Sequence, residues 1–156
     1  MILNLNQVSK TFPDGTEALK NITFSLESGD FCVIGGANGS GKSVLMSLIA
    51  KLEKPTSGKI NTEYAGLVFQ EADSQILGET PLEDVCYSLT NTGLKPAAAK
   101  EKALKLLEKV GLREKADYNA RTLSGGEKRR LAVASVLALE PNIIIFDEPF
   151  ANLDWK

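Results

Sequence analysis

Residues 36–43 read GANGSGKS, and this stretch decides how the rest of the chain is interpreted. It matches the pattern G-x-x-x-x-G-K-[ST], and it lies between an apolar run that predicts a strand and a periodic segment, residues 43–53, that predicts a helix. Glycines at these spacings let backbone N–H groups curl around phosphate oxygens, and the start of the helix adds a partial positive charge. The sequence therefore predicts a loop that binds the phosphates of a nucleoside triphosphate, rather than a merely flexible Gly/Ser turn.

The residues of this phosphate loop have distinct expected tasks. Lys42 would reach the terminal phosphates, and the Ser43 hydroxyl would ligate Mg²⁺. A dinucleotide-binding fingerprint fits less well, because a Lys-Ser pair directly after the last glycine is typical of triphosphate chemistry. The residues predicted to contact the nucleotide here are Gly36, Asn38, Gly39, Ser40, Gly41, Lys42, Ser43 and Val44.

A pair of carboxylates follows an apolar run near the other end of the chain. Asp147 and Glu148 come directly after the residues IIIF, so we expect them where a strand leaves the sheet, at the edge where ligands bind in open α/β folds. Adjacent residues on a strand point in opposite directions. Asp147 is therefore predicted to hold Mg²⁺, directly or through water, and Glu148 to polarise an attacking water as the chain turns at Pro149. A solvated DEP turn is the alternative.

Composition narrows the class of protein. The 156 residues fit one domain, with 43% hydrophobic and 24% charged residues, the balance of an ordinary globular protein. The net charge of −2 gives no basic footprint, so nucleic acid is not expected as a partner. Cys32 and Cys86 lack metal-ligand spacing, which predicts two reduced, partly buried thiols. The sequence shows no apolar run of about 18 residues and no leader pattern, so any membrane role is expected to be peripheral.

Short apolar runs and turn residues predict strands in the first third of the chain and helices in the middle. The first two strands are expected to pair antiparallel across the turn at residues 13–16, PDGT. The last run, NIIIF, predicts a strand buried on both faces of a parallel sheet. The predicted strands cover residues 2–8, 21–26, 31–36, 64–69 and 142–146, and the stretches predicted to be helical cover residues 82–89, 96–112 and 123–141.

Local signals mark where the helices begin and end. Pro81 and Pro96 suit first helical positions, and Gly111 suits a C-terminal cap. Ser124 begins a capping-box pattern before the last helix, and a proline three residues after its last alanine stops that helix. Strands that alternate with helices predict an α/β sandwich with an antiparallel β region at the N-terminus and a helical insert between about residues 80 and 120.

Residues 123–127, LSGGE, resemble the signature sequence of ATP-binding cassette (ABC) ATPases, because they lie between a phosphate loop and a strand that ends in DEP. The resemblance covers nearly the whole chain. It implies a P-loop NTPase sandwich, a single ATP-binding cassette domain over residues 1–156 with a helical subdomain at about residues 80–138, and ATP and Mg²⁺ as ligands. It also implies that Phe12 stacks on adenine, and that Gln70 touches Mg²⁺ and senses a membrane partner.

In such ATPases two subunits pack head to tail, so the resemblance implies a second ATPase subunit, in a homodimer or a heterodimer. Ser124, Gly125 and Gly126 would then act on the γ-phosphate bound by the other subunit, through a hydroxyl, backbone N–H groups and a positive helix end. Asp154, in ANLD, resembles the aspartate that communicates across this dimer.

Two further stretches, residues 12–30 and 68–76, look most like the ATPase subunits of energy-coupling factor importers, which serve vitamins or transition-metal ions. This likeness implies a transmembrane partner docked near residues 70–90 and a peripheral location on the cytoplasmic face of the cell membrane. Glu127 stands where the family more usually has glutamine. It adds a negative charge near the phosphate site, although its capping role would point it back at the helix end.

Members of that family continue beyond ANLD into another strand that carries a histidine, and the 156 residues contain no histidine. We therefore expect a chain that lacks the C-terminal part of the domain and that hydrolyses ATP weakly or not at all. Two other functions stay open. One is a nucleotide-binding module that regulates a full-length partner, and the other is a family member that acts in DNA repair or on ribosomes instead of in transport.

Overall fold

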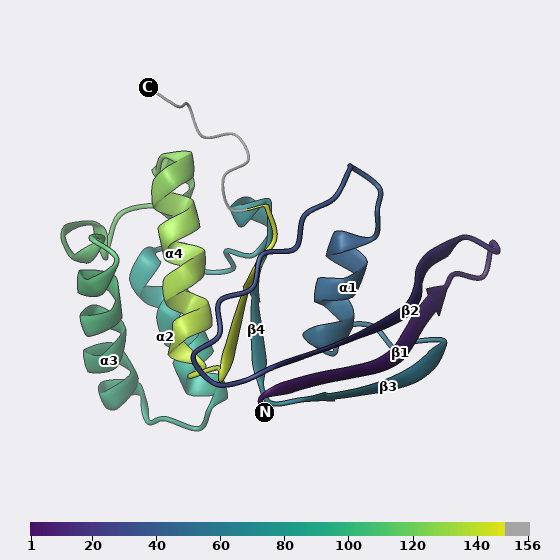
Figure 1. The fold of residues 1–156 in the computed structure, drawn as a ribbon. Coiled ribbons are helices and arrows are strands. Elements are labelled where there is room, and N and C mark those ends of the chain that lie inside the picture. Colours follow the sequence, from purple (N-terminus) through teal and green to yellow (C-terminus); the bar gives the residue numbers. More distant parts are fainter. Residues whose placement is uncertain (149–156) are drawn as a thin grey trace. The chain divides into compact units, whose positions relative to one another are not determined.

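The computed structural model describes residues 1–148, which fall into two units that divide after Leu67 (Figure 1). The predicted turn at Pro149 and the predicted site residue Asp154 lie outside the described residues. Each unit buries apolar side chains of its own, so each is described by itself.

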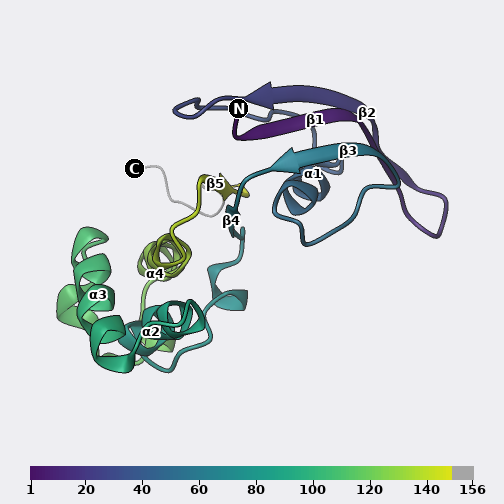
Figure 2. The same cartoon turned by 90° about the horizontal axis from the view of Figure 1, so that it is seen from below.

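The first unit, residues 1–67, is a three-stranded antiparallel sheet with one helix. Its strands follow the order β2-β1-β3, and its elements are β1 (Leu3–Thr11), β2 (Glu17–Leu26), α1 (Lys42–Ile49) and β3 (Ser57–Thr62). The central strand β1 pairs Leu3 with Leu26 of β2 and with Thr62 of β3. Leu5 and Val8 of β1 are fully buried, and α1 lies over one face of the sheet (Figures 1 and 2).

The antiparallel pairing of the first two strands is confirmed, but the sequence pattern missed β3. The turn at residues 13–16 closes with the Gly15 N–H donating to the Phe12 carbonyl at 2.9 Å. β3 reads SGKINT, and Ile60 is its one large apolar residue, so the alternation that marks a half-buried strand is almost absent from it. Its partner β1 supplies the pairing that its own residues do not indicate.

The prediction of a strand at residues 31–36 is wrong for the described structure. These residues belong to no strand, and Phe31 and Val33 are 93% and 78% exposed. A strand is stabilised by hydrogen bonds and side-chain contacts to its neighbours. Within residues 1–148 no strand pairs with this apolar segment, so its composition alone does not give it regular structure.

The helix that follows the phosphate loop is shorter than its periodicity predicts. α1 ends at Ile49, and Lys51 takes a left-handed backbone conformation with φ 59°. The Ser47 carbonyl then accepts hydrogen bonds from the N–H groups of Leu52 and Glu53 at 2.9 and 3.3 Å. These bonds close the helix and leave Glu53 in the connection that leads to β3.

The second unit, from Val68 onward, is built mainly from three helices that share one apolar core (Figure 2). The helices are α2 (Pro81–Asn91), α3 (Pro96–Lys109) and α4 (Gly125–Ala138), with short 3₁₀ turns η1 (Ala72–Ser74), η2 (Arg113–Lys115) and η3 (Ala120–Thr122). Leu89, Leu107 and Leu131, one from each helix, are fully buried in that core. Burial of this shared apolar surface is what holds three short helices together.

The predicted helix signals are found at the helix ends. α2 and α3 begin at prolines 81 and 96, and Gly111, just beyond α3, has φ 71°. Ser124 is the N-cap of α4 and forms a capping box with Glu127. Such signals act within one turn of chain, which is why they could be recognised without knowledge of the tertiary structure.

A short two-stranded sheet joins β4 (Ala65–Val68), which spans the division between the units, to β5 (Ile143–Phe146). The prediction that this last strand is buried on both faces is wrong for the described residues, because Ile144 and Phe146 are 39% and 41% exposed. Ile143 and Ile145, which alternate with them, are half-buried.

The two cysteines are free thiols with different surroundings. Cys86 on α2 is half-buried, as predicted, and this burial raises the pKa of its thiol. Cys32 is exposed, so the prediction of partial burial is wrong for this residue. It lies in the same irregular segment as Phe31 and Val33.

A buried carboxylate fastens the segment before α2 to the helices. Asp84 is 3% exposed, and its Oδ1 accepts hydrogen bonds from the N–H groups of Leu77 and Gly78 at 2.7 and 3.0 Å. Its Oδ2 accepts a hydrogen bond from the Ser135 hydroxyl of α4 at 2.5 Å. A Cβ atom at Gly78 would lie 2.4 Å from the Asp84 nitrogen, so this close approach requires glycine. Asp84 therefore ties a loop, α2 and α4 together.

We expect Asp84→Leu to lower the free energy of unfolding by about 2–4 kcal/mol, because two part-buried N–H groups and the buried Ser135 hydroxyl lose their acceptor. Asp84→Asn is the matched control. Its amide oxygen can still accept from Leu77 and Gly78, so the loss should be smaller. Urea unfolding followed by circular dichroism measures both variants, and a leucine variant as stable as the unmodified chain would contradict the role given to this carboxylate.

Candidate functional site

The phosphate loop turns into α1 through closely packed glycines, of which Gly41 could not be replaced without a shift of the backbone. Gly41, the N-cap of α1, has φ 89°, and a Cβ atom there would lie 2.4 Å from the Ala18 carbonyl oxygen. A Cβ atom at Gly36 would lie 2.6 Å from the Ser40 hydroxyl oxygen. The backbone therefore approaches its neighbours more closely than a side chain allows.

Lys42 folds back over the loop that precedes it. Its ammonium group donates hydrogen bonds to the carbonyls of Gly36 and Ala37 at 2.9 and 3.0 Å. No side chain caps the N-terminus of α1, and no acidic residue lies in its first turn. The loop therefore brings a lysine charge and uncapped N–H groups to one place, which is an arrangement suited to an anion such as a phosphate.

Phe12 belongs to the same unit and lies at the end of β1. Its N–H donates to the Thr16 carbonyl at 2.9 Å, so the turn that it opens fixes its backbone. Its side chain is half-buried, which leaves part of the ring available to a ligand. The first unit thus carries Phe12 and all of the predicted phosphate-loop residues, including Asn38, Gly39, Ser43 and Val44.

In the second unit, Gln70 and Glu148 lie within hydrogen-bond distance. The Gln70 amide nitrogen donates to a Glu148 carboxylate oxygen at 3.0 Å. They meet because each follows the end of one of two paired strands, and the Asp147 N–H donates to the Val68 carbonyl at 3.0 Å. Glu148 has φ 45°, a left-handed conformation that costs about 1–3 kcal/mol in a residue other than glycine and that is concentrated at functional sites.

Asp147 carries a buried oxygen without a partner. Within the described residues its Oδ1 has no hydrogen bond, which is costly for a carboxylate and is the arrangement expected where a cation is held. Residues 1–148 contain no cluster of three or more His, Cys, Asp or Glu side chains. A Mg²⁺ ion would therefore need hydroxyl, amide and phosphate oxygens besides this carboxylate, which is the donor set that Mg²⁺ commonly takes beside phosphates.

The N-terminus of α4 is organised around Glu127. Its carboxylate accepts from the Ser124 N–H at 2.9 Å and pairs with the Lys115 ammonium at 2.5 Å, while the Ser124 hydroxyl accepts from the Glu127 N–H at 3.3 Å. The expectation that capping points this side chain back at its own helix is confirmed. The lysine offsets its negative charge, and open space surrounds the Cα of Gly125. This helix start can therefore face an incoming ligand.

Basic residues of α4 hold the segment that follows β4, which sequence patterns did not reveal. Arg129 donates to the backbone carbonyl of Gln70 at 3.2 Å, and Lys128 pairs with Asp73 at 2.5 Å. The run KRR directly after the signature was the available signal, but a charge run usually marks a solvated face. These contacts fix the position of the Gln70 backbone relative to the helix that begins after Ser124.

A model of the ABC transporter family matches residues 19–151, most of the chain. The chain belongs to the ABC transporter family. The matched region holds the phosphate loop, Gln70, the signature residues and both carboxylates, so the sequence-based assignment to this family is confirmed.

Two relatives show which ABC proteins this chain is similar to. It is 37% identical to the energy-coupling factor transporter ATP-binding protein EcfA of Methanosphaera stadtmanae, over 98% of this chain and 61% of that protein. It is also 37% identical to EcfA2, an energy-coupling factor transporter ATP-binding protein of Streptococcus thermophilus, over 99% of this chain and 63% of that protein. The chain thus spans less than two thirds of the length of either relative.

Solved structures of ABC proteins share the fold. CbiO1 from Clostridium perfringens, part of the ABC transporter complex CbiONQ, matches with a TM-score of 0.87 at 32% identity, over 98% of this chain and 67% of that one. The ATP-binding cassette MJ0796, in a dimeric post-hydrolysis state with ADP and Pi, matches with a TM-score of 0.86 at 31% identity, over 97% and 76%. The predicted α/β P-loop NTPase class is confirmed.

The stability of the helix that carries the signature should depend on pH through the charge of Glu127. A hydrogen bond from Lys115, together with the Ser124 N–H, lowers the pKa of Glu127 from 4.5 to about 2. Because the folded pKa is below the unfolded one, this carboxylate stabilises the fold above about pH 4.5, and the contribution is lost as the pH falls toward 2. Glu127→Gln keeps a capping side chain but removes the charge.

We therefore expect Glu127→Gln to be less stable than the unmodified chain at pH 6 and about equally stable near pH 2. Urea unfolding across that pH range measures the difference. Glu108→Gln, on an exposed position of α3, serves as the control and should show a smaller change. A difference for Glu127→Gln that stays constant down to pH 2 would contradict the assignment.

Proposed function

We propose that this chain binds Mg-ATP through residues 36–44 and that, paired with a second ATPase subunit, it hydrolyses ATP to drive a small solute through a membrane partner. The observation that carries the proposal is the phosphate loop, where the Lys42 ammonium and the uncapped start of α1 come together. Residues 1–156 would form one ATP-binding cassette domain, with the helices of about residues 80–138 as its helical subdomain.

Mg²⁺ would be held by Ser43, Gln70 and Asp147, and the unpartnered Oδ1 of Asp147 supports that set. The bound ion neutralises charge on the β- and γ-phosphates. Glu148 would accept a proton from the attacking water. The Gln70 amide, which donates to Glu148 in this structure, would hold that carboxylate in the orientation that the water requires.

The signature residues would act on the ATP of the other subunit. The Ser124 N–H is taken by the Glu127 carboxylate, so the groups left for a γ-phosphate are the Ser124 hydroxyl and the N–H groups of Gly125 and Gly126. The Glu127 carboxylate caps the helix, but its negative charge is offset by Lys115. The start of the helix can therefore still attract a phosphate. A measurement of the assembled dimer would show whether the second subunit is a copy of this chain or a related chain.

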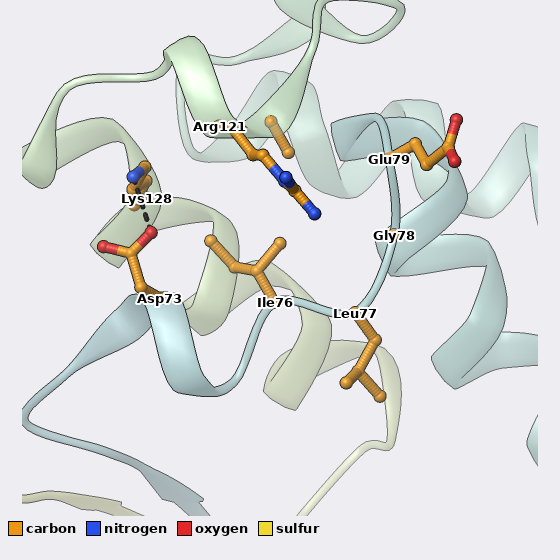
Figure 3. Close-up of a pocket in the computed structure, with 8 residues that line it drawn as sticks. Asp73, Ile76, Leu77, Gly78, Glu79, Arg121 and Lys128 are labelled. Carbon is orange, nitrogen blue, oxygen red and sulfur yellow. Dashed lines mark hydrogen bonds and ion pairs between the residues drawn. The ribbon is translucent and has the colours of Figure 1, made fainter.

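A groove in the second unit would receive the membrane partner. Its volume is about 440 Å³, and its lining residues are Asp73, Ile76, Leu77, Gly78, Glu79, Ala120, Arg121 and Lys128. Figure 3 shows Arg121 reaching in from η3 toward the segment of Ile76 and Leu77, and the ion pair of Lys128 with Asp73 at the far side. Leu77 is 71% exposed, so the groove offers an apolar contact beside charges of both signs.

The names of the relatives support transport by an energy-coupling factor system. A vitamin or a transition-metal ion as the solute is what the resemblance of residues 12–30 and 68–76 to such importers implies. No helix among residues 1–148 is long and apolar enough to cross a membrane. The membrane partner would hold the chain at the cytoplasmic face of the membrane as a peripheral subunit, in line with relatives that are ATP-binding proteins of transporters.

Mg-ATP at a hundred times its dissociation constant should stabilise the chain by about 2.7 kcal/mol if it binds the folded state alone. Lys42→Ala should weaken ATP binding about tenfold to a hundredfold, because it removes charge-assisted hydrogen bonds to phosphate. Thermal unfolding with and without Mg-ATP measures both effects. Lys59→Ala, at an exposed position on β3, should leave the ATP-induced shift of the unfolding midpoint unchanged. An unmodified chain whose midpoint does not change with ATP would refute the proposal.

Glu148→Gln should reduce ATP turnover at least about a hundredfold while ATP binding persists, since a general base contributes factors of that size or more. Glu140→Gln, an exposed carboxylate after α4, is the control and should turn over ATP normally. Phosphate release at saturating Mg-ATP measures turnover. Equal turnover of Glu148→Gln and the unmodified chain would refute the role of Glu148, whereas an unmodified chain that binds ATP without releasing phosphate would favour the nucleotide-binding module.

A further inference from the structure

Lys10 lies on β1, two residues before Phe12, and its ammonium group lies over the phenylalanine ring. The nitrogen is 5.2 Å from the ring centroid. At this distance a cation is attracted to the negative face of an aromatic ring. The Lys10 side chain is 13% exposed, so water screens the attraction less than it would at the open surface.

Two acceptors fix the ammonium group in this position. Lys10 donates to a carboxylate oxygen of Glu53 and to the backbone carbonyl of Lys54, each at 2.9 Å. A hydrogen bond from the same lysine lowers the pKa of Glu53, which favours the carboxylate form of this acceptor. Glu53 lies just after α1, the helix that starts at the phosphate loop. The cation over Phe12 is thus anchored to the connection that follows α1.

We infer that Lys10 is a positioning residue for nucleotide binding, which holds Phe12 by one face of its ring and leaves the opposite face for the base. This inference rests on the proposed function, in which Phe12 stacks on adenine. A ring that is held before the nucleotide arrives loses less conformational entropy on binding than a freely rotating one. Lys10 would therefore strengthen the binding of ligands that carry a base.

A purely structural role for Lys10 makes a different prediction. If the lysine served only to tie β1 to the connection after α1, its loss would disturb the phosphate loop or the whole unit. Every ligand of that loop would then bind more weakly, whether or not it carried a base. Mg-ATP and Mg-tripolyphosphate separate the two roles, because the second ligand has phosphates but no ring to stack.

The experiment is calorimetric titration of the full chain with both ligands. We expect Lys10→Met to raise the dissociation constant for Mg-ATP about threefold, in line with a partly exposed cation–π contact, and to leave that for Mg-tripolyphosphate unchanged. Phe12→Ala should raise the constant for Mg-ATP at least about fivefold, again without effect on tripolyphosphate. In the Phe12→Ala background, Lys10→Met should add nothing, because the ring through which it acts is gone.

Controls keep the result interpretable. Lys20→Met removes a lysine of β2 that is 72% exposed, and it should change neither constant. Lys10→Arg keeps the cation and should stay within about twofold of the unmodified chain. If Lys10→Met does not fold, Glu53→Gln takes its place, since it removes the charged anchor of the lysine and should weaken ATP binding in the same selective way.

The outcomes separate this inference from the proposed function. Lys10→Met that leaves ATP binding unchanged, tightens it, or weakens both ligands equally would overturn the inference, while Phe12→Ala with weaker ATP binding would still support base stacking. Phe12→Ala without any effect on ATP would remove the stacking role and the inference with it. ATP-selective loss in Lys10→Met that disappears in the double variant would establish the positioning role.

Discussion

The close backbone approach at Gly41 is the constraint on which the first unit depends. The Ala18 carbonyl lies where a side chain would begin, so β2 and the start of α1 can pack only because that position is bare. From this contact follow the direction of α1, the place of its uncapped N–H groups and the reach of Lys42 back to Gly36. Glu53, which accepts from the lysine that covers Phe12, lies in the connection that follows this helix.

The second unit depends on α4 in a comparable way. Its buried side packs against α2 and α3, and Ser135 reaches the carboxylate of Asp84. Its polar side holds the backbone of Gln70 through Arg129, and Gln70 in turn contacts Glu148. Two hydrogen bonds, both made by Gln70, therefore link the helix that presents the signature to the carboxylate proposed as general base. A displacement of α4 would change the position of that carboxylate through these bonds.

Sequence reasoning succeeded where the determinants are local and failed where a partner decides. The prolines that open α2 and α3 and the capping box at Ser124 each act within a few residues. β3 escaped notice because its pairing with β1 outweighs its polar composition. The segment around Phe31 was expected to form a strand and β5 to be buried on both faces, but each outcome needs a neighbour that composition cannot supply. Arg129 and Gln70 are 59 residues apart in sequence, so their contact produces no periodic pattern that sequence analysis could detect.

The exposed thiol beside the phosphate loop has a practical consequence. Cys32 is open to reagents and lies four residues before Gly36, whereas Cys86 is half-buried and its thiolate is disfavoured by that burial. A maleimide or an oxidant should therefore meet Cys32 first. Cys32 is therefore a natural attachment point for a spectroscopic label close in sequence to the phosphate loop. For the same reason, oxidation of Cys32 in the absence of a reductant could disturb that loop.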